Sequence, residues 1–117
     1  MKSLEKFYRN KKVLITGHTG FKGAWLSIWL HRLGSKVYGI SLPENKASLF
    51  KRSGIKRLFK NKDHYQDIRH YQKYREKILK INPEIIFHMA AQPIVKSGYD
   101  YPLHTFESNI LGTANTI

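Results

Sequence analysis

The stretch Val13-Leu14-Ile15-Thr16-Gly17-His18-Thr19-Gly20-Phe21-Lys22-Gly23-Ala24-Trp25-Leu26 decides the fold of this chain. A short apolar run stops at Gly17, and two further glycines follow at intervals of three residues. An apolar pattern with a helical period begins directly after them. The order of strand, glycine turn and helix is that of a phosphate-binding βα unit. We therefore predict a buried strand over residues 12–16 and a helix over residues 21–33.

Each of the three glycines has a physical reason to be where it is. Gly17 permits a tight turn out of the strand, Gly20 lets backbone N–H groups approach a pyrophosphate, and Gly23 lets the helix pack closely on the strand. The spacing G-x-x-G-x-x-G differs from the G-x-G-x-x-G of classical dehydrogenases. Because a strand precedes the glycines and a helix follows them, the pattern favours dinucleotide binding over a purely structural turn.

The rest of the chain alternates between the two kinds of element. The pattern predicts strands over residues 36–40, 63–68 and 84–89. It predicts helices over residues 47–59, 70–80 and from 103 onward, with Ser53-Gly54 weakening the first of them. Such alternation is typical of the α/β class, here a Rossmann-like doubly wound parallel sheet. The last helix has no stop signal, so we expect an incomplete domain: residues 1–117 would be the N-terminal part of an NAD(P)-binding Rossmann domain, with the substrate domain absent.

The apolar residues of the two longest predicted helices indicate which faces pack on the sheet. For the helix over residues 21–33 the expected stripe consists of Trp25, Ile28, Trp29 and Leu33, widened by Leu26 and Leu30. For the last helix it consists of Phe106, Ile110, Leu111, Ala114 and Ile117.

Composition excludes several classes of protein. A length of 117 residues fits one domain, and the absence of cysteine excludes a disulfide framework and a thiolate metal site. The six histidines show no metal-binding spacing, so we expect no metal site. No apolar run has the length of a secretory signal or a membrane span, which favours a cytoplasmic protein without membrane contact.

The net charge of +13 is concentrated in two segments. Residues 1–12 contain five basic side chains and one acidic side chain. Residues 44–80 contain twelve basic and four acidic side chains. The plainest interpretation is a solvated basic face. A field that attracts anionic nucleotides and a nucleic-acid surface are the alternatives, of which nucleic acid is the less favoured because the aromatic residues nearby have helical spacing.

Several runs together resemble one known family. The run from Thr16 to Trp25 resembles the cofactor loop of the extended short-chain dehydrogenases/reductases, the NAD-dependent epimerase/dehydratase family. Three further runs match the same family: Asp67-Ile68-Arg69, Pro83-Glu84-Ile85-Ile86-Phe87-His88-Met89-Ala90-Ala91-Gln92-Pro93, and Asn109-Ile110-Leu111-Gly112-Thr113. Within the family the chain is most similar to the dehydratases that act on CDP-glucose, over roughly residues 10–117.

The resemblance implies a cofactor, a substrate and a reaction. The cofactor would be NAD and the substrate of the full-length protein a nucleotide sugar, with a homodimer as its assembly. In these enzymes NAD takes hydride from C4 of the sugar and returns it to C6 after water has left. CDP-glucose thereby becomes CDP-4-keto-6-deoxyglucose, a precursor of surface polysaccharide sugars.

The resemblance also implies a set of cofactor-binding residues. They are Gly17, His18, Gly20, Phe21, Lys22, Gly23, Asp67, Ile68, Ala90, Ala91, Gln92 and Asn109. The glycine loop would line the pyrophosphate, and the residues at 67–68 would contact the adenine. The residues at 90–92 would lie beside the nicotinamide ribose, and the asparagine would support the active site.

Five residues in these runs also have a purely structural interpretation. Lys22 could be an exposed first-turn lysine, and His18 a turn residue with a free imidazole. Asp67 could be an ordinary helix N-cap, and Asn109 a plain helix residue. His88 lies within an apolar strand, which favours a packed core histidine over a ligand.

Two features depart from the usual pattern. The acidic residue that binds the adenosine ribose in classical dehydrogenases is replaced by Ser41 and Leu42, with Glu44 only beyond a proline. Lys46 keeps NADP possible, although the resemblance favours NAD.

The second departure concerns the family's catalytic Tyr-x-x-x-Lys pair. The one match here is Tyr8 to Lys12, which precedes the first strand, so we predict no catalytic residue in this chain. We expect that these residues alone do not catalyse the reaction. There are two alternatives to the CDP-glucose dehydratase. The chain could be a non-catalytic nucleotide-binding remnant, or part of another nucleotide-sugar epimerase or dehydratase.

Overall fold

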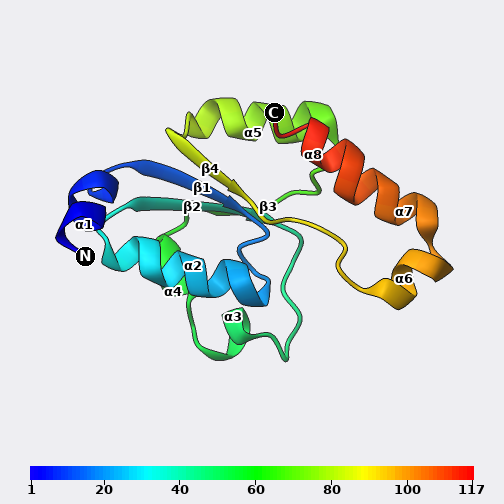
Figure 1. Ribbon diagram of the computed structural model, residues 1–117, viewed down its shortest axis with the longest axis horizontal. Coiled ribbons are helices and arrows are strands. Elements are labelled where there is room, and N and C mark those ends of the chain that lie inside the picture. Colours follow the sequence, from blue (N-terminus) through cyan, green and yellow to red (C-terminus); the bar gives the residue numbers. More distant parts are fainter.

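The computed structural model describes residues 1–117 as one four-stranded parallel sheet with helices on both faces (Figure 1). The strands are β1 (Lys12–Thr16), β2 (Lys36–Ser41), β3 (Asp63–Tyr65) and β4 (Ile85–His88). They lie in the order β3-β2-β1-β4. Strands β2 and β3 are added on one side of β1 and β4 on the other, so the order of the strands reverses between β1 and β4. Val13 of β1 is in register with Val37 of β2 and with Ile85 of β4. The predicted strands and the predicted α/β class are confirmed.

Helices cover the two faces in the doubly wound manner. On one face lie α2 (Phe21–Arg32), α3 (Leu49–Arg52) and α4 (Lys56–Phe59), and on the other lie α5 (Tyr71–Ile81) and the C-terminal helical segments (Figure 1). Those segments are α7 (Pro102–Phe106), the π-helical η1 (Glu107–Leu111) and α8 (Gly112–Ala114), which follow one another without a break. Two further short helices, α1 (Lys2–Tyr8) and α6 (Val95–Asp100), were not predicted. None of the helices is both long and apolar enough to cross a membrane.

The alternation of side chains along β1 divides the core in two. Val13 and Ile15 belong to a cluster under α2, α3 and α4, whereas Leu14 belongs to a cluster under α5. The first cluster includes Phe50 and the second Tyr74, and both side chains are fully buried. Burial on both faces is what makes the β1 sequence a continuous apolar run rather than an alternating one.

The helix predicted over residues 47–59 is split in two. Ser48 begins α3 by accepting a hydrogen bond from Lys51 N at 3.2 Å. Gly54 then takes a φ of +68°, a conformation that side-chain-bearing residues rarely adopt, and α4 begins after it. Gly54 thus breaks the helix at the position where the sequence weakened it.

The predicted buried stripe of α2 is partly wrong. Leu30 and Leu33 are buried as expected, but Trp25 and Trp29 are 55% and 48% exposed. The face pressed on the sheet carries small residues, among them Ala24 and Ser27. The reason is the tight approach at the N-terminus of α2, where the glycine loop leaves no space for a large side chain.

The predicted apolar face of the last helix is wrong. Phe106, Ile110 and Leu111 are 61%, 59% and 49% exposed, and Ile117 is fully exposed. Gly112 is buried instead, and a Cβ there would lie 2.4 Å from Ile68 Cδ1. The side chains that turn inward around it are polar ones, which form the hydrogen bonds described below. Periodicity of apolar residues therefore pointed to the wrong face.

Candidate functional site

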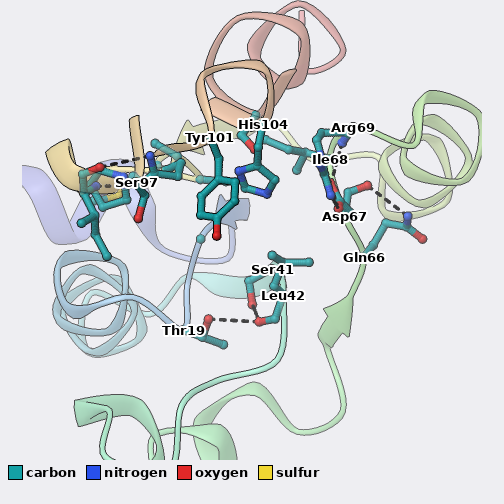
Figure 2. Close-up of a pocket in the computed structure, with 18 residues that line it drawn as sticks. Thr19, Ser41, Leu42, Gln66, Asp67, Ile68, Arg69, Ser97, Tyr101 and His104 are labelled. Atoms are coloured by element: carbon teal, nitrogen blue, oxygen red, sulfur yellow. Dashed lines mark hydrogen bonds and ion pairs between the residues drawn. The ribbon is translucent and has the colours of Figure 1, made fainter. Parts of the chain in front are cut away.

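A cleft of about 540 Å³ lies at the carboxyl ends of the four strands. Four segments that follow the strands line it: Gly17 and Thr19, Ser41 and Leu42, Gln66 to Arg69, and Met89 to Ile94. A fifth group comes from α6 and the C-terminal helical segments: Ser97, Tyr101, His104 and Ser108. Figure 2 shows Tyr101 and His104 on the opposite side of the cleft from Thr19, Ser41 and Leu42. We call this the strand-end cleft; in open α/β sheets, ligands bind at this end and at the reversal of strand order.

The glycine loop is built for close approach. Gly17 has a φ of +74°, and a Cβ on it would lie 2.9 Å from the backbone of Ala90. A Cβ on Gly23 would lie 2.2 Å from the carbonyl oxygen of Gly17, so only glycine fits where α2 meets the loop. A Cβ on Gly20 would meet the same oxygen at 3.3 Å, a tight contact but a less severe one than at Gly23.

The N-terminus of α2 is uncapped by any side chain. Gly20 is the N-cap residue, and no side chain hydrogen bonds there. The first-turn N–H groups, together with the positive end of the helix dipole, are therefore available to an anion. Phe21 and Lys22 are exposed in this turn, and Lys22 forms none of the ion pairs of the structure.

The His18 ring lies in the core rather than in the strand-end cleft. It is fully buried between Phe50 and Phe59, with ring centroids 5.2 and 4.8 Å away. Neither ring nitrogen has a hydrogen-bond partner. Burial lowers the pKa of His18 from 6.5 to about 4, although the negative charge of Asp63 opposes the shift. The free-imidazole interpretation is therefore wrong, and only the backbone of His18 remains beside the glycine loop.

Asp67 and Arg69 form an ion pair at the end of β3. Asp67 Oδ1 accepts a hydrogen bond from Arg69 N at 2.9 Å, and Asp67 Oδ2 accepts one from Arg69 Nη2 at 2.6 Å. These hydrogen bonds lower the pKa of Asp67. The N-cap of α5 is His70, so the N-cap interpretation of Asp67 is wrong. Its neighbour Ile68 is buried, and Figure 2 shows the three residues together at one side of the cleft.

The segment that follows β4 is fixed at both ends. At its start, Met89 N and Ala90 N donate to Thr16 Oγ1 at 3.0 and 3.1 Å. At its end, Asn109 accepts from Gln92 N at 2.7 Å and donates to Gln92 O at 3.1 Å. We call residues 89–92 the β4 wall of the cleft. Asn109 is therefore not a plain helix residue, since it holds the backbone of this wall.

His88 is half-buried and fully hydrogen-bonded rather than packed in an apolar core. Its Nδ1 lies 2.8 Å from Thr16 Oγ1 and its Nε2 lies 3.0 Å from Thr113 Oγ1. Burial lowers the pKa of His88. His88 does not line the strand-end cleft, and the core-histidine interpretation misses these contacts.

The region expected to bind the adenosine ribose has no free carboxylate. Ser41 Oγ donates to Leu42 O at 2.8 Å, and Thr19 Oγ1 donates to the same oxygen at 3.2 Å. Glu44 instead accepts from the hydroxyl of Tyr65 at 2.5 Å, beside Lys56. Lys46 is exposed.

The one Tyr-x-x-x-Lys match in the chain lies away from the cleft. Lys12 Nζ donates to Ile81 O at 3.3 Å, at the amino end of β1, so the pair Tyr8 and Lys12 lies at the opposite end of the strand from the cleft. No group of three or more histidine, aspartate or glutamate side chains is placed to hold a metal ion.

Sequence reasoning missed several residues that line the cleft. His104 and Ser108 are four residues apart, a helical spacing, and Tyr101 is the N-cap residue three positions before His104. That polar spacing was a usable signal, but the apolar pattern of the same helix hid it. The role of Thr16 could not be found, because its partners are more than 70 residues away in the sequence.

Comparison with known proteins shows the family of this chain. The family model described as GDP-mannose 4,6 dehydratase matches residues 14–117. CDP-glucose 4,6-dehydratase of Salmonella typhimurium is 42% identical over 114 residues, which cover 97% of this chain and 31% of that protein. GDP-mannose 4,6 dehydratase 2 of Caenorhabditis elegans is 34% identical, over 94% of this chain and 31% of that protein. This chain thus spans about three tenths of the length of these relatives.

Solved structures show the same fold. UDP-glucose-4-epimerase from Stenotrophomonas maltophila, solved with bound NAD, matches with a TM-score of 0.74 at 24% identity, over 91% of this chain and 32% of that one. Pen from Bacillus thuringiensis matches with a TM-score of 0.70 at 27% identity, over 93% and 33% of the two chains. Since the family model extends from β1 to the last residue, the chain belongs to the nucleotide-sugar 4,6-dehydratase and epimerase family, which has an NAD-binding Rossmann fold.

Proposed function

We propose that this chain binds NAD in the strand-end cleft and is the cofactor-binding part of a dehydratase that converts CDP-glucose to CDP-4-keto-6-deoxyglucose. The observation that carries the cofactor proposal is the glycine loop: Gly17 and Gly23 leave no room for a Cβ, and the uncapped N-terminus of α2 faces the loop. The sugar proposal rests on the 42% identity to the CDP-glucose dehydratase.

We expect a dinucleotide to extend from the glycine loop, along the strand-end cleft, to the β4 wall. The pyrophosphate would lie at Gly20, Phe21 and Lys22, where N–H groups and one side-chain cation meet it. Gly17, Gly23 and the backbone of His18 shape this turn. Asp67 and Ile68 would contact the adenine, with Asp67 already oriented by Arg69.

The β4 wall would contact the nicotinamide half. Ala90 and Ala91 have the small side chains that leave room for a ribose, and both line the cleft. The side chain of Gln92 is already hydrogen-bonded to Ile94 and Thr105. Gln92 would therefore contact the cofactor through its backbone, which Asn109 holds. When bound, the nicotinamide would supply the acceptor and later the donor of hydride, and this chain's residues would hold it in place.

The cofactor should be NAD rather than NADP. Arg69 is the one arginine or lysine that lines the cleft, and it is already paired with Asp67 and Glu107, whereas a 2′-phosphate would require a cation near Ser41 and Leu42. Lys46 is exposed and makes no hydrogen bond or ion pair. Parallel titrations with NAD and NADP test this choice, and tighter binding of NADP would contradict it.

The first test is a calorimetric titration of the chain with NAD. Gly20→Val should lower the affinity at least tenfold, which corresponds to about 1.4 kcal/mol. The thermal unfolding midpoint should fall less than for a substitution of Gly23, because a Cβ would lie 3.3 Å from Gly17 O at Gly20 but 2.2 Å from it at Gly23. Gly98→Ala is a matched control, since a Cβ there meets nothing closer than Thr105 Oγ1 at 3.9 Å. A flat titration of the unmodified chain at millimolar NAD would refute the proposal.

The substrate proposal needs a chimera, because this chain matches only 31% of the Salmonella relative. Residues 1–117 replace the matching part of that protein, and the product is assayed with CDP-glucose, GDP-mannose and UDP-glucose. Formation of a 4-keto sugar from CDP-glucose is expected. GDP-mannose is the second candidate, because the matching family model is described by it. An inactive chimera that still binds NAD would favour the non-catalytic remnant.

A further inference from the structure

A hydrogen-bond network lies under the strand-end cleft, between the sheet and the C-terminal helical segments. Thr16 Oγ1 at the end of β1 accepts from Met89 N and Ala90 N, and it also lies 2.8 Å from His88 Nδ1. On the far side of the ring, His88 Nε2 lies 3.0 Å from Thr113 Oγ1. The imidazole therefore links β1 and β4 to the helix that carries Asn109.

The positions of the protons in this network follow from counting lone pairs. Thr113 donates its hydroxyl proton to Asn109 O at 2.6 Å, so Thr113 Oγ1 can only accept from His88, and the ring proton must be on Nε2. His88 Nδ1 is then an acceptor and receives the hydroxyl proton of Thr16. The acceptor positions of Thr16 Oγ1 face Ala90 N and Met89 N, and Met89 N is shared with the Thr16 carbonyl oxygen at 3.1 Å.

The hydroxyls of Tyr74 and Thr116 lie on the Nδ1 side of the ring and do not change the tautomer. Thr116 Oγ1 donates to Gly112 O at 2.9 Å, so Tyr74 must donate its hydroxyl proton to Thr116 Oγ1 at 2.8 Å. Thr116 Oγ1 lies 3.3 Å from His88 Nδ1, a longer contact than that of Thr16. Tyr74 is the one titratable group that reaches the ring, through Thr116, and no charged side chain contacts the ring.

We propose that His88, held as the neutral Nε2–H tautomer, is a positioning residue that fixes the β4 wall of the cofactor cleft. The ring orients Thr16 so that its oxygen accepts the Met89 and Ala90 amides, and through Thr113 it connects to the helix turn at Asn109. Asn109 in turn holds Gln92. The role of this wall at a cofactor rests on the function proposed above, whereas the tautomer and the fixed wall do not.

Protonation of the ring would disturb this arrangement. An imidazolium donates from both nitrogens, so Nδ1–H would compete with Met89 N and Ala90 N for the Thr16 hydroxyl oxygen. Met89 N keeps the Thr16 carbonyl oxygen as a second acceptor, so the weakened contacts would be those to Thr16 Oγ1. The β4 wall should loosen as His88 becomes protonated, and cofactor affinity should fall with it.

The first test is ¹⁵N NMR of the histidine rings of the whole chain near neutral pH. We expect ring-nitrogen shifts typical of an Nε2–H tautomer for His88 in the unmodified chain. Thr16→Val should move these shifts, because Nδ1 loses its donor, whereas Thr16→Ser should preserve them. Shifts of an Nδ1–H tautomer, or of a rapidly exchanging mixture, would overturn the proposal.

The second test measures the wall itself by amide hydrogen exchange and by NAD titration. His88→Asn keeps a side-chain oxygen near the position of Nδ1, and His88→Leu removes both polar contacts. We expect faster exchange at Met89 and Ala90, and about fivefold to tenfold weaker NAD binding, in His88→Leu, with His88→Asn intermediate. His31→Asn, on α2, is the control and should change neither. Unchanged exchange in both His88 variants would overturn the proposal.

The two readouts separate this inference from the proposed function. If the unmodified chain binds no NAD but shows the tautomer and the exchange response, the fixed wall stands and the cofactor proposal fails. If NAD binds but exchange at Met89 and Ala90 is insensitive to His88, the positioning role fails and the cofactor proposal stands. If His88→Leu does not fold, the comparison is made with His88→Asn alone.

Discussion

The side-chain amide of Asn109 pairs with both backbone groups of Gln92. Its Oδ1 accepts from Gln92 N at 2.7 Å and its Nδ2 donates to Gln92 O at 3.1 Å. Asn109 lies in the π-helical segment η1, beside the β4 wall. Asparagine suits the position because it carries one acceptor and one donor in the same plane.

Asn109→Asp should weaken both the fold and cofactor binding. A carboxylate can still accept from Gln92 N, but it would place an oxygen against the Gln92 carbonyl oxygen in place of a donor. We expect a loss of about 1–3 kcal/mol in the free energy of unfolding, measured by urea denaturation at neutral pH. Asn45→Asp is the matched control, because Asn45 Oδ1 only accepts from Ala47 N and a carboxylate can do the same. Equal stability of the two variants would contradict this role of Asn109.

The sequence predicted this part of the site only incompletely. The resemblance pointed to Asn109, but not to Gln92 as its partner, because the two are 17 residues apart and meet only in the folded chain. In the same way, β1 and the glycine loop were predictable because strand, turn and helix are local. The burial of His18 between Phe50 and Phe59 was not predictable. These two side chains belong to α3 and α4, two short helices that local sequence patterns barely define.

The faces of two helices were mispredicted for a physical reason. Apolar periodicity assumes that the largest apolar residues are buried, but close packing at Gly23 and Gly112 selects small residues for the contact. On α2 this leaves Trp25 and Trp29 partly exposed, and on the last helix it leaves Phe106 exposed. The helix glycines at these close contacts were therefore the better signal for the buried face.

Leu30→Ala and Trp25→Ala should separate these two faces of α2. Leu30 is 1% exposed within the core cluster, so its truncation should cost about 2–5 kcal/mol of unfolding free energy. Trp25 is 55% exposed, and its truncation should cost about 1 kcal/mol or less. Urea denaturation of both variants measures the difference. A larger loss for Trp25→Ala would show that the tryptophan face is the buried one.

Gly23→Ala should destabilise the chain more than Gly20→Ala. A Cβ on Gly23 would lie 2.2 Å from Gly17 O and 2.9 Å from His18 Cα, both backbone atoms that cannot move without opening the loop. A Cβ on Gly20 has only a 3.3 Å contact with the same oxygen. We expect a loss of about 1–3 kcal/mol at Gly23, typical of overpacking, against little change at Gly20, measured by thermal or urea unfolding. The reverse order would show that the loop has a different geometry.

The stability of the chain should fall with acidification because of His18. The pKa of His18 is about 4 in the folded chain, against 6.5 for an unperturbed histidine, because burial disfavours the charged ring. On acidification the unfolded state therefore takes up a proton first. The contribution of His18 is at its maximum above pH 6.5, falls between pH 6.5 and 4, and changes no further below the folded pKa. The shift corresponds to about 3 kcal/mol at most.

His18→Leu should flatten this part of the pH profile, since leucine keeps an apolar side chain of similar size between Phe50 and Phe59. The measurement is urea denaturation of both chains at intervals from pH 7 to pH 4. The slope should not vanish entirely, because the pKa values of His64 and His88 are also lowered, mainly by burial. If the two chains lose stability in parallel over this range, the His18 ring is not the buried neutral group that the structure shows.

The edge of β4 should make the isolated chain associate. β4 is the last strand of the order β3-β2-β1-β4, so one side of its backbone has no partner strand, and unpaired edges promote association. Trp25, Trp29 and Phe106 add partly exposed apolar surface. We expect a concentration-dependent increase in mass by sedimentation. The double substitution of Trp25 and Trp29 by lysine should reduce association without unfolding the chain, because neither side chain belongs to the core. A monodisperse monomer at all concentrations would show that this apolar surface and the free edge are insufficient to drive association.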